Sequence, residues 1–131
     1  MTERPSAQPV ERVDKPWGHE EIFAIVEGSY VGKTLHVAGG ESLSLQWHHE
    51  KDETLAVLSG EVEFDLGMSE DDLRTVPVAP GEAVHVPPRL LHRIRALSDA
   101  VLIEASTAAP GWREDVVRLE DRYGRSGTQA P

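Results

Sequence analysis

Residues 40–48 read GESLSLQWH, and Glu53 follows five positions after the final histidine. Side chains two positions apart on a β-strand point to the same face, so Gln46 and His48 are expected to project together. A second glycine-led stretch ends on another imidazole at His92. Two imidazoles, a carboxylate and an amide oxygen make a donor set for a divalent metal ion. The pattern therefore indicates a small β-barrel that holds a metal.

Short β-prone segments, often alternating in polarity, fill most of the chain and are separated by turn-forming residues. We expect strands at residues 20–26, 30–37, 42–48, 54–58, 61–66, 83–87, 92–96 and 100–105. Many short strands with regular turns predict an all-β fold, a double-stranded β-helix or jelly-roll barrel. Residues 67–74 are acidic and predict a loop, and a helical turn is expected only at 112–118. We expect a single domain at 13–125, with a flexible lead-in at 1–12 and a flexible tail at 126–131.

The composition of the chain excludes several classes of protein. Its 131 residues suffice for one domain and one core. The chain has no cysteine, so disulfides and thiolate metal sites are excluded, which suits a cytoplasmic protein. A net charge of −10 argues against a nucleic-acid partner, because phosphate backbones need a basic face. No apolar run approaches a membrane span, and the first twelve residues lack the apolar centre of a signal peptide.

The alternation of side chains along residues 42–48 also suggests whether the protein forms an oligomer. If Gln46 and His48 face inward, then Leu43, Leu45 and Trp47 face outward. An apolar outer face must be covered, either by another strand of the same chain or by a partner. We expect a homodimer, and the N-terminal strand is the alternative cover.

The predicted metal ligands are Gln46, His48, Glu53 and His92. Zinc is the first expectation, because catalytic zinc accepts such sets and keeps one position open. Iron, manganese, cobalt and nickel also fit, and affinity order alone does not choose between them. An amide is a weak ligand, which favours Lewis-acid over redox chemistry. Of the remaining histidines, we expect His49 to be solvated, His85 to be a less favoured ligand, His36 to be an ordinary strand residue and His19 a loop residue.

These residues resemble a known family. The stretch 40–48 with Glu53 and Gly60 is similar to the first cupin motif, with Gln46 in place of its first histidine, and 81–92 is similar to the second. Within the cupins, residues 13–125 most resemble the type II mannose-6-phosphate isomerase domain, which is often fused to GDP-mannose pyrophosphorylase. The block EDVVRLEDRYGR at 114–125 is the most specific part of this resemblance. The resemblance implies a zinc-type site at the Gln, His, Glu and His positions.

The chain departs from that family around the expected substrate mouth. It reads Lys51-Asp-Glu53-Thr-Leu where the family has a basic residue and Glu-His-Trp. It reads Pro88-Arg89 where the family has a small residue and glycine, and Ile94-Arg95-Ala96 where the family has Leu-x-Asn. Residues 108–113 replace a Gly-x-Tyr-Leu-Gly stretch. Substrate discrimination depends on such first-contact residues, so the resemblance does not fix the substrate.

The leading functional interpretation is an isomerase-like cupin that acts on a sugar phosphate or a similar polar metabolite. Aldose–ketose exchange moves a proton between C1 and C2, and it needs a base, oxyanion stabilisation and a site for the phosphate. The resemblance suggests Glu104 as the base, and a structural pairing of Glu104 with an arginine is the alternative. Lys33 is the second candidate catalytic residue. Together with Arg93 and Arg118, it is also a candidate for binding phosphate or carboxylate.

Two other classes stay open, because a fold does not determine its chemistry. One is another metal-dependent cupin enzyme: an epimerase, lyase, cyclase or oxygenase. The other is a non-catalytic module that binds a sugar or metabolite. Metal content together with a turnover assay separates these classes.

Overall fold

The computed structural model describes residues 6–127 and is an all-β structure over that range. The strands are β1 (Glu11–Lys15), β2 (Gly18–Val26), β3 (Tyr30–Val37), β4 (Leu45–Trp47), β5 (Glu53–Ser59), β6 (Val62–Gly67), β7 (Arg74–Val78), β8 (Ala83–Val86), β9 (Leu91–Ala96), β10 (Ala100–Thr107) and β11 (Val117–Glu120). One short 3-10 helix, η1 (Glu70–Asp72), lies between β6 and β7. Among the described residues, no helix is long and apolar enough to cross a membrane.

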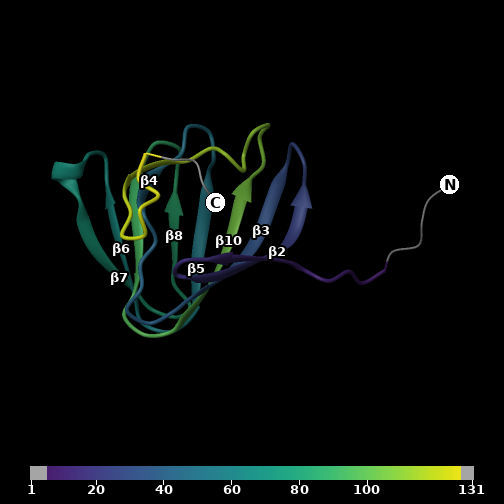
Figure 1. Ribbon diagram of the computed structural model, residues 1–131, viewed down its shortest axis with the longest axis horizontal. Helices are drawn as coiled ribbons and strands as arrows, with labels where there is room; N and C mark the ends of the chain where they lie inside the picture. Colours follow the sequence, from purple (N-terminus) through teal and green to yellow (C-terminus); the bar gives the residue numbers. More distant parts are fainter. Residues whose placement is uncertain (1–5, 128–131) are drawn as a thin grey trace.

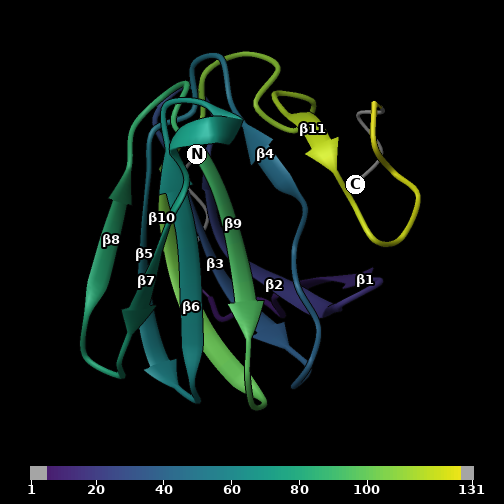
Figure 2. The same ribbon diagram turned by 90° about the vertical axis from the view of Figure 1, so that its left-hand side faces the viewer.

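The strands form two antiparallel sheets that face each other. The six-stranded sheet has the order β1-β2-β3-β10-β5-β8, and the five-stranded sheet has the order β11-β4-β9-β6-β7. Figure 1 shows the two sheets side by side around a common interior, with the segments near the C-terminus crossing the upper rim. In Figure 2, β11 lies beside β4 at the outer edge of its sheet. The predicted double-sheet barrel is therefore confirmed.

The core lies between the sheets and is built by alternation along each strand. On β5, Glu53, Leu55 and Val57 are buried, whereas Thr54 and Leu58 are exposed. Phe64 from β6 and Leu102 from β10 are fully buried in the same cluster. Each such apolar side chain contributes roughly 1.5–3 kcal/mol of burial free energy. The same alternation that buries leucine and valine carries the carboxylates of Glu53 and Glu104 into the interior, where they contribute to the candidate site.

All eight predicted strands occur, with small shifts at their ends. Three further strands, β1, β7 and β11, were not predicted. β1 reads ERVDK and β7 contains Pro77, so neither has the apolar alternation of a half-buried strand. The helical turn expected at 112–118 is wrong. Consecutive turns end near Glu114 and lead into β11, which pairs with β4.

The first strand overlaps the end of the predicted lead-in. β1 begins at Glu11, inside the stretch expected as a lead-in. Residues 1–5 and 128–131 of the predicted lead-in and tail lie outside the described residues. The domain limits at 13 and 125 stay predictions.

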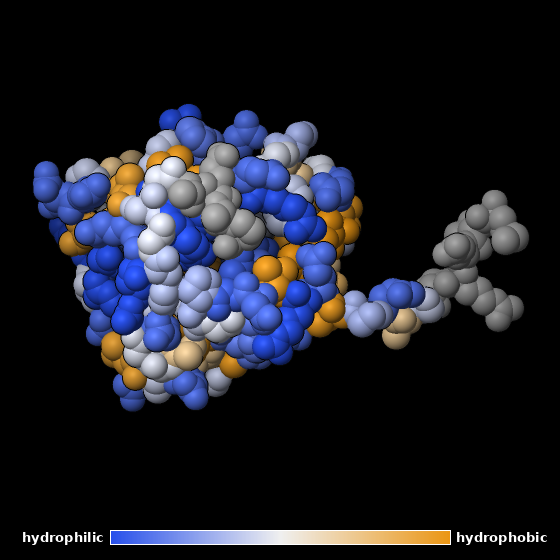
Figure 3. All heavy atoms as spheres, viewed as in Figure 1, coloured by the Kyte–Doolittle hydropathy of each residue, from blue (hydrophilic) through white to orange (hydrophobic). Residues whose placement is uncertain are grey.

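Hydrophilic residues cover most of the face seen in Figure 3, and apolar residues gather at its right-hand side over β2 and β3. We expected that Leu45 would need covering by another strand or by a partner, but within the single chain only 1% of it is exposed. Leu43 does not point outward, because it lines the interior cavity. Neither Leu43 nor Leu45 therefore needs a partner chain to cover it, and the homodimer stays a prediction.

Candidate metal centre and its cavity

The interior of the barrel holds a cavity of about 560 Å³ lined from both sheets. This volume lies within the range of small-molecule sites. Its wall includes Gln46, His48, Glu53 and His92, the four predicted metal ligands. Glu104, Lys33 and Arg118 line it as well. The structure therefore brings all but one of the predicted site residues to one cavity.

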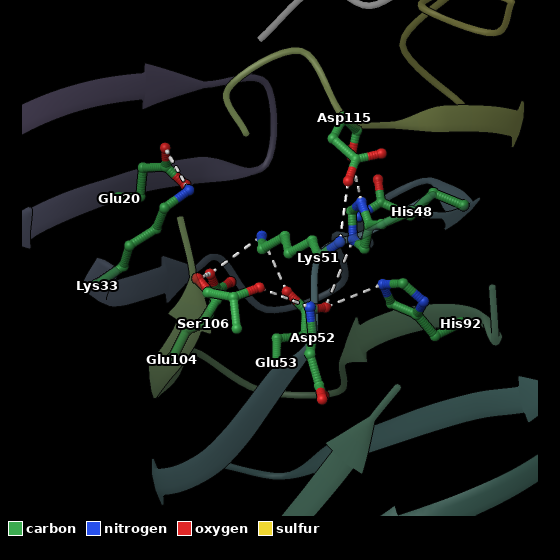
Figure 4. Close-up of polar contacts among 12 residues, drawn as sticks. Glu20, Lys33, His48, Lys51, Asp52, Glu53, His92, Glu104, Ser106 and Asp115 are labelled. Carbon is green, nitrogen blue, oxygen red and sulfur yellow. Dashed lines mark hydrogen bonds and ion pairs between the residues drawn. The ribbon is translucent and has the colours of Figure 1, made fainter. Parts of the chain in front are cut away.

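Three of the predicted ligands converge within the cavity wall. The ligand atoms of His48, Glu53 and His92 all lie within 4.8 Å of one another, and all three residues are buried. Glu53 Oε1 is 3.6 Å from His48 Nε2 and 3.2 Å from His92 Nε2. Figure 4 shows the three side chains pointing toward one another from separate elements. Such a set of two nitrogens and one oxygen is typical of divalent metal sites with open positions.

Backbone carbonyls determine which nitrogen of each imidazole faces the centre. His48 Nδ1 lies 2.6 Å from the carbonyl oxygen of Asp115, and His92 Nδ1 lies 2.9 Å from that of Leu90. A carbonyl oxygen only accepts, so each Nδ1 must donate, and each neutral ring keeps its lone pair on Nε2. Both Nε2 atoms are buried and make no hydrogen bond within the described residues. A buried lone pair without a donor fits a metal ion, and a carbonyl on the far nitrogen is the usual support for such a ligand.

Gln46 lies beside this trio on the inner face of the five-stranded sheet. It is directly opposite His92 on β9, and Arg118 of β11 is opposite it on the other side. Directly opposite residues of antiparallel strands project to the same face. The hydroxyl of Ser44 donates to Gln46 Oε1 at 2.6 Å, which holds the amide in place. Gln46 therefore borders the centre with an oriented amide oxygen.

Lys51 connects the metal centre to the candidate base. Its ammonium nitrogen lies 2.9 Å from Glu53 Oε2 and 3.1 Å from Glu104 Oε2. Burial acts to lower the pKa of Lys51, but the charges of Glu104 and Glu53 outweigh burial and raise this pKa above its ordinary value. Burial would likewise raise the pKa of Glu53, but the positive charge of Lys51 acts against it, and the pKa lies well below its usual range. Lys51 is thus a permanent cation between two carboxylates.

Glu104 points into the cavity and is held on two sides. It is 4% exposed on β10, and the hydroxyl of Ser106 donates to its Oε2 at 3.1 Å. The expected alternative, a structural pair with an arginine, is replaced by the pair with Lys51. Sequence reasoning missed the role of Lys51. Its position could have indicated this role, because Lys51 lies two residues before Glu53 in the stretch that departs from the family pattern.

Lys33 enters the cavity but belongs to a different group. Its ammonium nitrogen lies 3.4 Å from both oxygens of Glu20, and Lys15 lies 3.8 Å from the same carboxylate. In Figure 4, Lys33 and Glu20 stand apart from Lys51 and Glu104. Lys33 is therefore not in contact with the candidate base, although its backbone is paired with that of Glu104.

Four cations line this part of the wall: Lys15, Lys33, Arg118 and Arg125. Burial lowers the pKa of Lys15, Glu20 partly offsets this, and the charges of the other three cations lower it further. Burial also lowers the pKa of Arg118, and Arg125 adds to the effect. Glu20 pairs with Lys15 and Lys33, and Asp121 pairs with Arg125, so the cations in this group outnumber the carboxylates that pair with them.

Arg93 is the predicted residue that the structure does not bring to the cavity. It follows His92 directly on β9, so alternation turns it to the opposite face of the sheet. There its Nε donates to Asp65 Oδ2 at 2.9 Å, and its Nη1 to Glu120 Oε2 at 3.3 Å. The structure therefore places Arg93 apart from the other predicted site residues, with carboxylate partners on the outer face.

Asp115 holds the loop between His48 and Glu53. Its carboxylate accepts the backbone N–H groups of His49, Glu50 and Lys51 at 2.7, 2.9 and 2.9 Å. Burial acts to raise the pKa of Asp115, but these three hydrogen bonds outweigh it and lower the pKa. In the sequence, Asp115 stood out only as part of the block 114–125, and nothing local indicated that its carboxylate binds amides 64 to 66 residues away.

The turn at Arg89 also supports His48, one of the predicted metal ligands. Arg89 has φ of +73°, in the left-handed region that favours glycine. Its backbone N–H donates to the carbonyl oxygen of His48 at 2.8 Å. The departure from the family pattern at Pro88-Arg89 therefore keeps a glycine-like backbone conformation with a non-glycine residue. His85, the less favoured ligand, points away and pairs with Asp52 at 2.6 Å.

Comparison with known proteins agrees with the predicted resemblance. Residues 33–105 match the family model described as a cupin domain. The xanthan biosynthesis protein XanB of Xanthomonas campestris pv. campestris (strain B100) is 30% identical over 117 residues, 88% of this chain and 24% of XanB. Mannose-1-phosphate guanylyltransferase RfbM of Salmonella typhimurium is 28% identical over 118 residues, 88% of this chain and 23% of RfbM. The chain thus spans about a quarter of the length of the curated relatives it matches.

Solved structures agree on the fold. The structure of CapF with the inhibitor 3-isopropenyl-tropolone superposes with a TM-score of 0.72 at 20% identity. The match covers 88% of this chain and 36% of CapF. At this identity the likeness concerns the fold alone.

Proposed function

This chain belongs to the cupin family, and we propose that it is a metal-dependent enzyme that isomerises a small phosphorylated sugar. The observation that carries the proposal is the pair of buried imidazole nitrogens that face Glu53 in the wall of the interior cavity. Relatives named for mannose-1-phosphate guanylyltransferase and for xanthan biosynthesis support a sugar-phosphate substrate. The expected cytoplasmic location and homodimer belong to the same proposal.

The proposed ligands are His48, Glu53 and His92, with Gln46 as a weaker fourth donor. Zinc fits best, because two imidazoles and a carboxylate leave room for an oxygen of the substrate. Iron, manganese, cobalt and nickel stay open. When bound, the metal supplies Lewis-acid stabilisation of charge that develops on the sugar oxygens.

The chain itself supplies the proton transfer. Glu104 takes the proton from C2 of the open-chain aldose and returns it to C1, while the hydroxyl proton moves from O2 to O1, which converts the aldose to the ketose through an enediolate. The hydroxyl of Ser106 and the ammonium of Lys51 keep the Glu104 carboxylate in a single orientation. Lys51 is also a donor for the enediolate oxygen.

The proposed binding site for the phosphate is the part of the cavity wall that carries Lys15, Lys33, Arg118 and Arg125. Arg118 lies on the same inner face as His92 with one strand between them, so the two are ~10 Å apart across the sheet. This spacing suits a ligand whose reacting end meets the metal while its phosphate meets Arg118, Lys15 and Lys33. Lys33 therefore moves in this proposal from a catalytic role to phosphate binding.

A coupled assay tests the proposal with zinc-loaded protein and several hexose and pentose phosphates. Turnover of mannose 6-phosphate to fructose 6-phosphate, stopped by a chelator, is the expected result. His92→Ala is expected to lose both metal and turnover, whereas His85→Ala, a solvent-exposed histidine, keeps both. Absence of turnover on every sugar phosphate, together with tight binding of an unphosphorylated metabolite, would reject the isomerase.

One observation favours a second candidate, a non-catalytic binding module. Glu104 Oε2 already accepts from Lys51 and Ser106, so the candidate base has fixed partners in the free protein. In a binding module these contacts would remain in the complex. Ligand affinity without turnover, unaffected by Glu104→Gln, is the result expected for that function.

A further inference from the structure

A second group of metal-ligating side chains lies on the outer face of the six-stranded sheet. It consists of His19 and Glu21 on β2 and His36 on β3. The neighbouring residues Glu20 and Leu35 are buried and line the cavity, so alternation turns this group away from the cavity. None of the three lines the cavity. The group is thus separate from the proposed metal centre.

The strand register brings the three side chains together. His19 is directly opposite His36, and Glu21 follows two positions later on the same face. Glu21 Oε1 lies 2.9 Å from His36 Nε2 and 3.4 Å from His19 Nε2. The ligand atoms of all three lie within 4.8 Å of one another. Two ring nitrogens therefore face one carboxylate oxygen, as they do in the interior.

The two imidazoles are held in a regular arrangement. Their rings stack with centroids 4.3 Å apart and planes 7° from parallel. Gly18 makes this possible at the start of β2, because a Cβ there would lie 2.0 Å from the carbonyl oxygen of His36. The backbones of β2 and β3 therefore meet very closely beside the group. Donors carried by paired strands are positioned more rigidly than donors carried by loops.

The group is open to solvent on one side. The side chains of His19, Glu21 and His36 are 20%, 33% and 35% exposed. Two imidazoles and one carboxylate bind first-row transition ions, and the exposed side leaves positions for water. We propose that His19, Glu21 and His36 form a second metal site, which takes Zn²⁺, Ni²⁺ or a similar ion from solution. It exchanges its ion faster than the interior centre, because its three side chains are partly exposed to solvent.

A different arrangement would give the same distances. Glu21 can simply accept hydrogen bonds from the two histidines, as a surface ion pair without a metal. That arrangement predicts one metal equivalent per chain, held by the interior residues alone. The number of bound ions therefore separates the two interpretations.

The test is calorimetric titration of the metal-free full chain with Zn²⁺ and, separately, with Ni²⁺. Two ions per chain are expected, falling to one in His36→Gln and in Glu21→Gln. His92→Ala should instead lose the other equivalent. His85→Gln removes a surface histidine that also has a carboxylate partner, and it should leave two. Thermal melting checks that each variant is folded, and Glu21→Gln serves if His36→Gln is not.

An independent readout locates the ion. In NMR spectra, sub-stoichiometric Ni²⁺ should broaden the amide signals of residues 19–21 and 34–36, and His36→Gln should abolish this broadening. The proposal is overturned if His36→Gln and Glu21→Gln bind as many ions as the parent chain. It is equally overturned if His92→Ala removes all binding.

Discussion

The carbonyl oxygen of Asp115 accepts a hydrogen bond from His48 Nδ1 at 2.6 Å, while the Asp115 carboxylate caps three amides of the following loop. One residue near the C-terminal end therefore orients a proposed ligand and holds the segment that carries Lys51. The C-terminal block is thereby part of the site and not only of the fold.

Asp115→Asn should weaken metal binding, because a neutral amide accepts the three N–H groups less well. The variant keeps the backbone carbonyl that orients His48 and weakens only the support of the following loop, so the loss should not exceed the ~10-fold that marks the lower end for a lost partner of a ligand. Calorimetric titration with Zn²⁺ measures this. Asp99→Asn is the matched control, since Asp99 caps the amide of Gly39 at 2.7 Å on another loop. Equal affinity in the two variants would contradict the role of Asp115.

The same residue predicts a pH dependence of folding. The hydrogen bonds from three amides outweigh burial and lower the pKa of Asp115 in the folded protein from its ordinary 3.8. A carboxyl with a lowered folded pKa stabilises the fold above its unfolded pKa, and the stabilisation is lost as pH falls toward the folded pKa. The difference in unfolding free energy between parent and Asp115→Asn should therefore be constant at pH 5–7 and shrink below about 4. Urea titrations across this range measure it, and a difference that grows at low pH would refute the assignment.

Lys51→Met should destabilise the metal-free protein strongly. It leaves the carboxylates of Glu53 and Glu104 buried without their shared cation. Removing one partner of a buried ion pair costs about 3–5 kcal/mol. Denaturant unfolding measures the loss. Lys51→Arg keeps the charge and should recover part of the stability, whereas a Met variant as stable as the parent would show that the pair contributes little.

Glu104→Gln should lower kcat about 10²–10⁴-fold if Glu104 is the base, because an amide does not take up a proton. Metal content should stay that of the parent, since Glu104 is not a proposed ligand. Ser106→Ala removes a hydrogen bond to the same oxygen and should have the smaller effect. Equal turnover in Glu104→Gln and the parent would remove Glu104 from the reaction.

Arg118→Gln should raise KM for a phosphorylated substrate about tenfold or more, the loss expected for a hydrogen bond to a charged group. Arg93→Gln should not, because Arg93 pairs with Asp65 and Glu120 on the outer face. Initial-rate kinetics on both variants make the comparison. A larger KM effect at Arg93 would contradict the proposed position of the phosphate.

The sequence by itself determined the fold class and the common face of Gln46 and His48, but not the side taken by Leu43, which precedes β4 and lines the cavity. Alternation has a period of two wherever a strand forms, so the common face of Gln46 and His48 could be predicted without any partner. The same rule, applied to the adjacent pair His92-Arg93, already separates a cavity residue from an outer one. The weak strands β1, β7 and β11 could not be predicted, because they form by pairing with stronger neighbours and not from their own pattern.

Only the tertiary structure decided which side chains meet. It pairs Lys51 rather than Lys33 with Glu104, and it brings Asp115 to His48 across 67 residues of chain. It also makes neighbours of His19 and His36, which we expected from the sequence to be a loop residue and an ordinary strand residue. The physical reason is that strand parity is a local property. Contacts between strands depend on sheet order and register, and these are set by packing of the whole core.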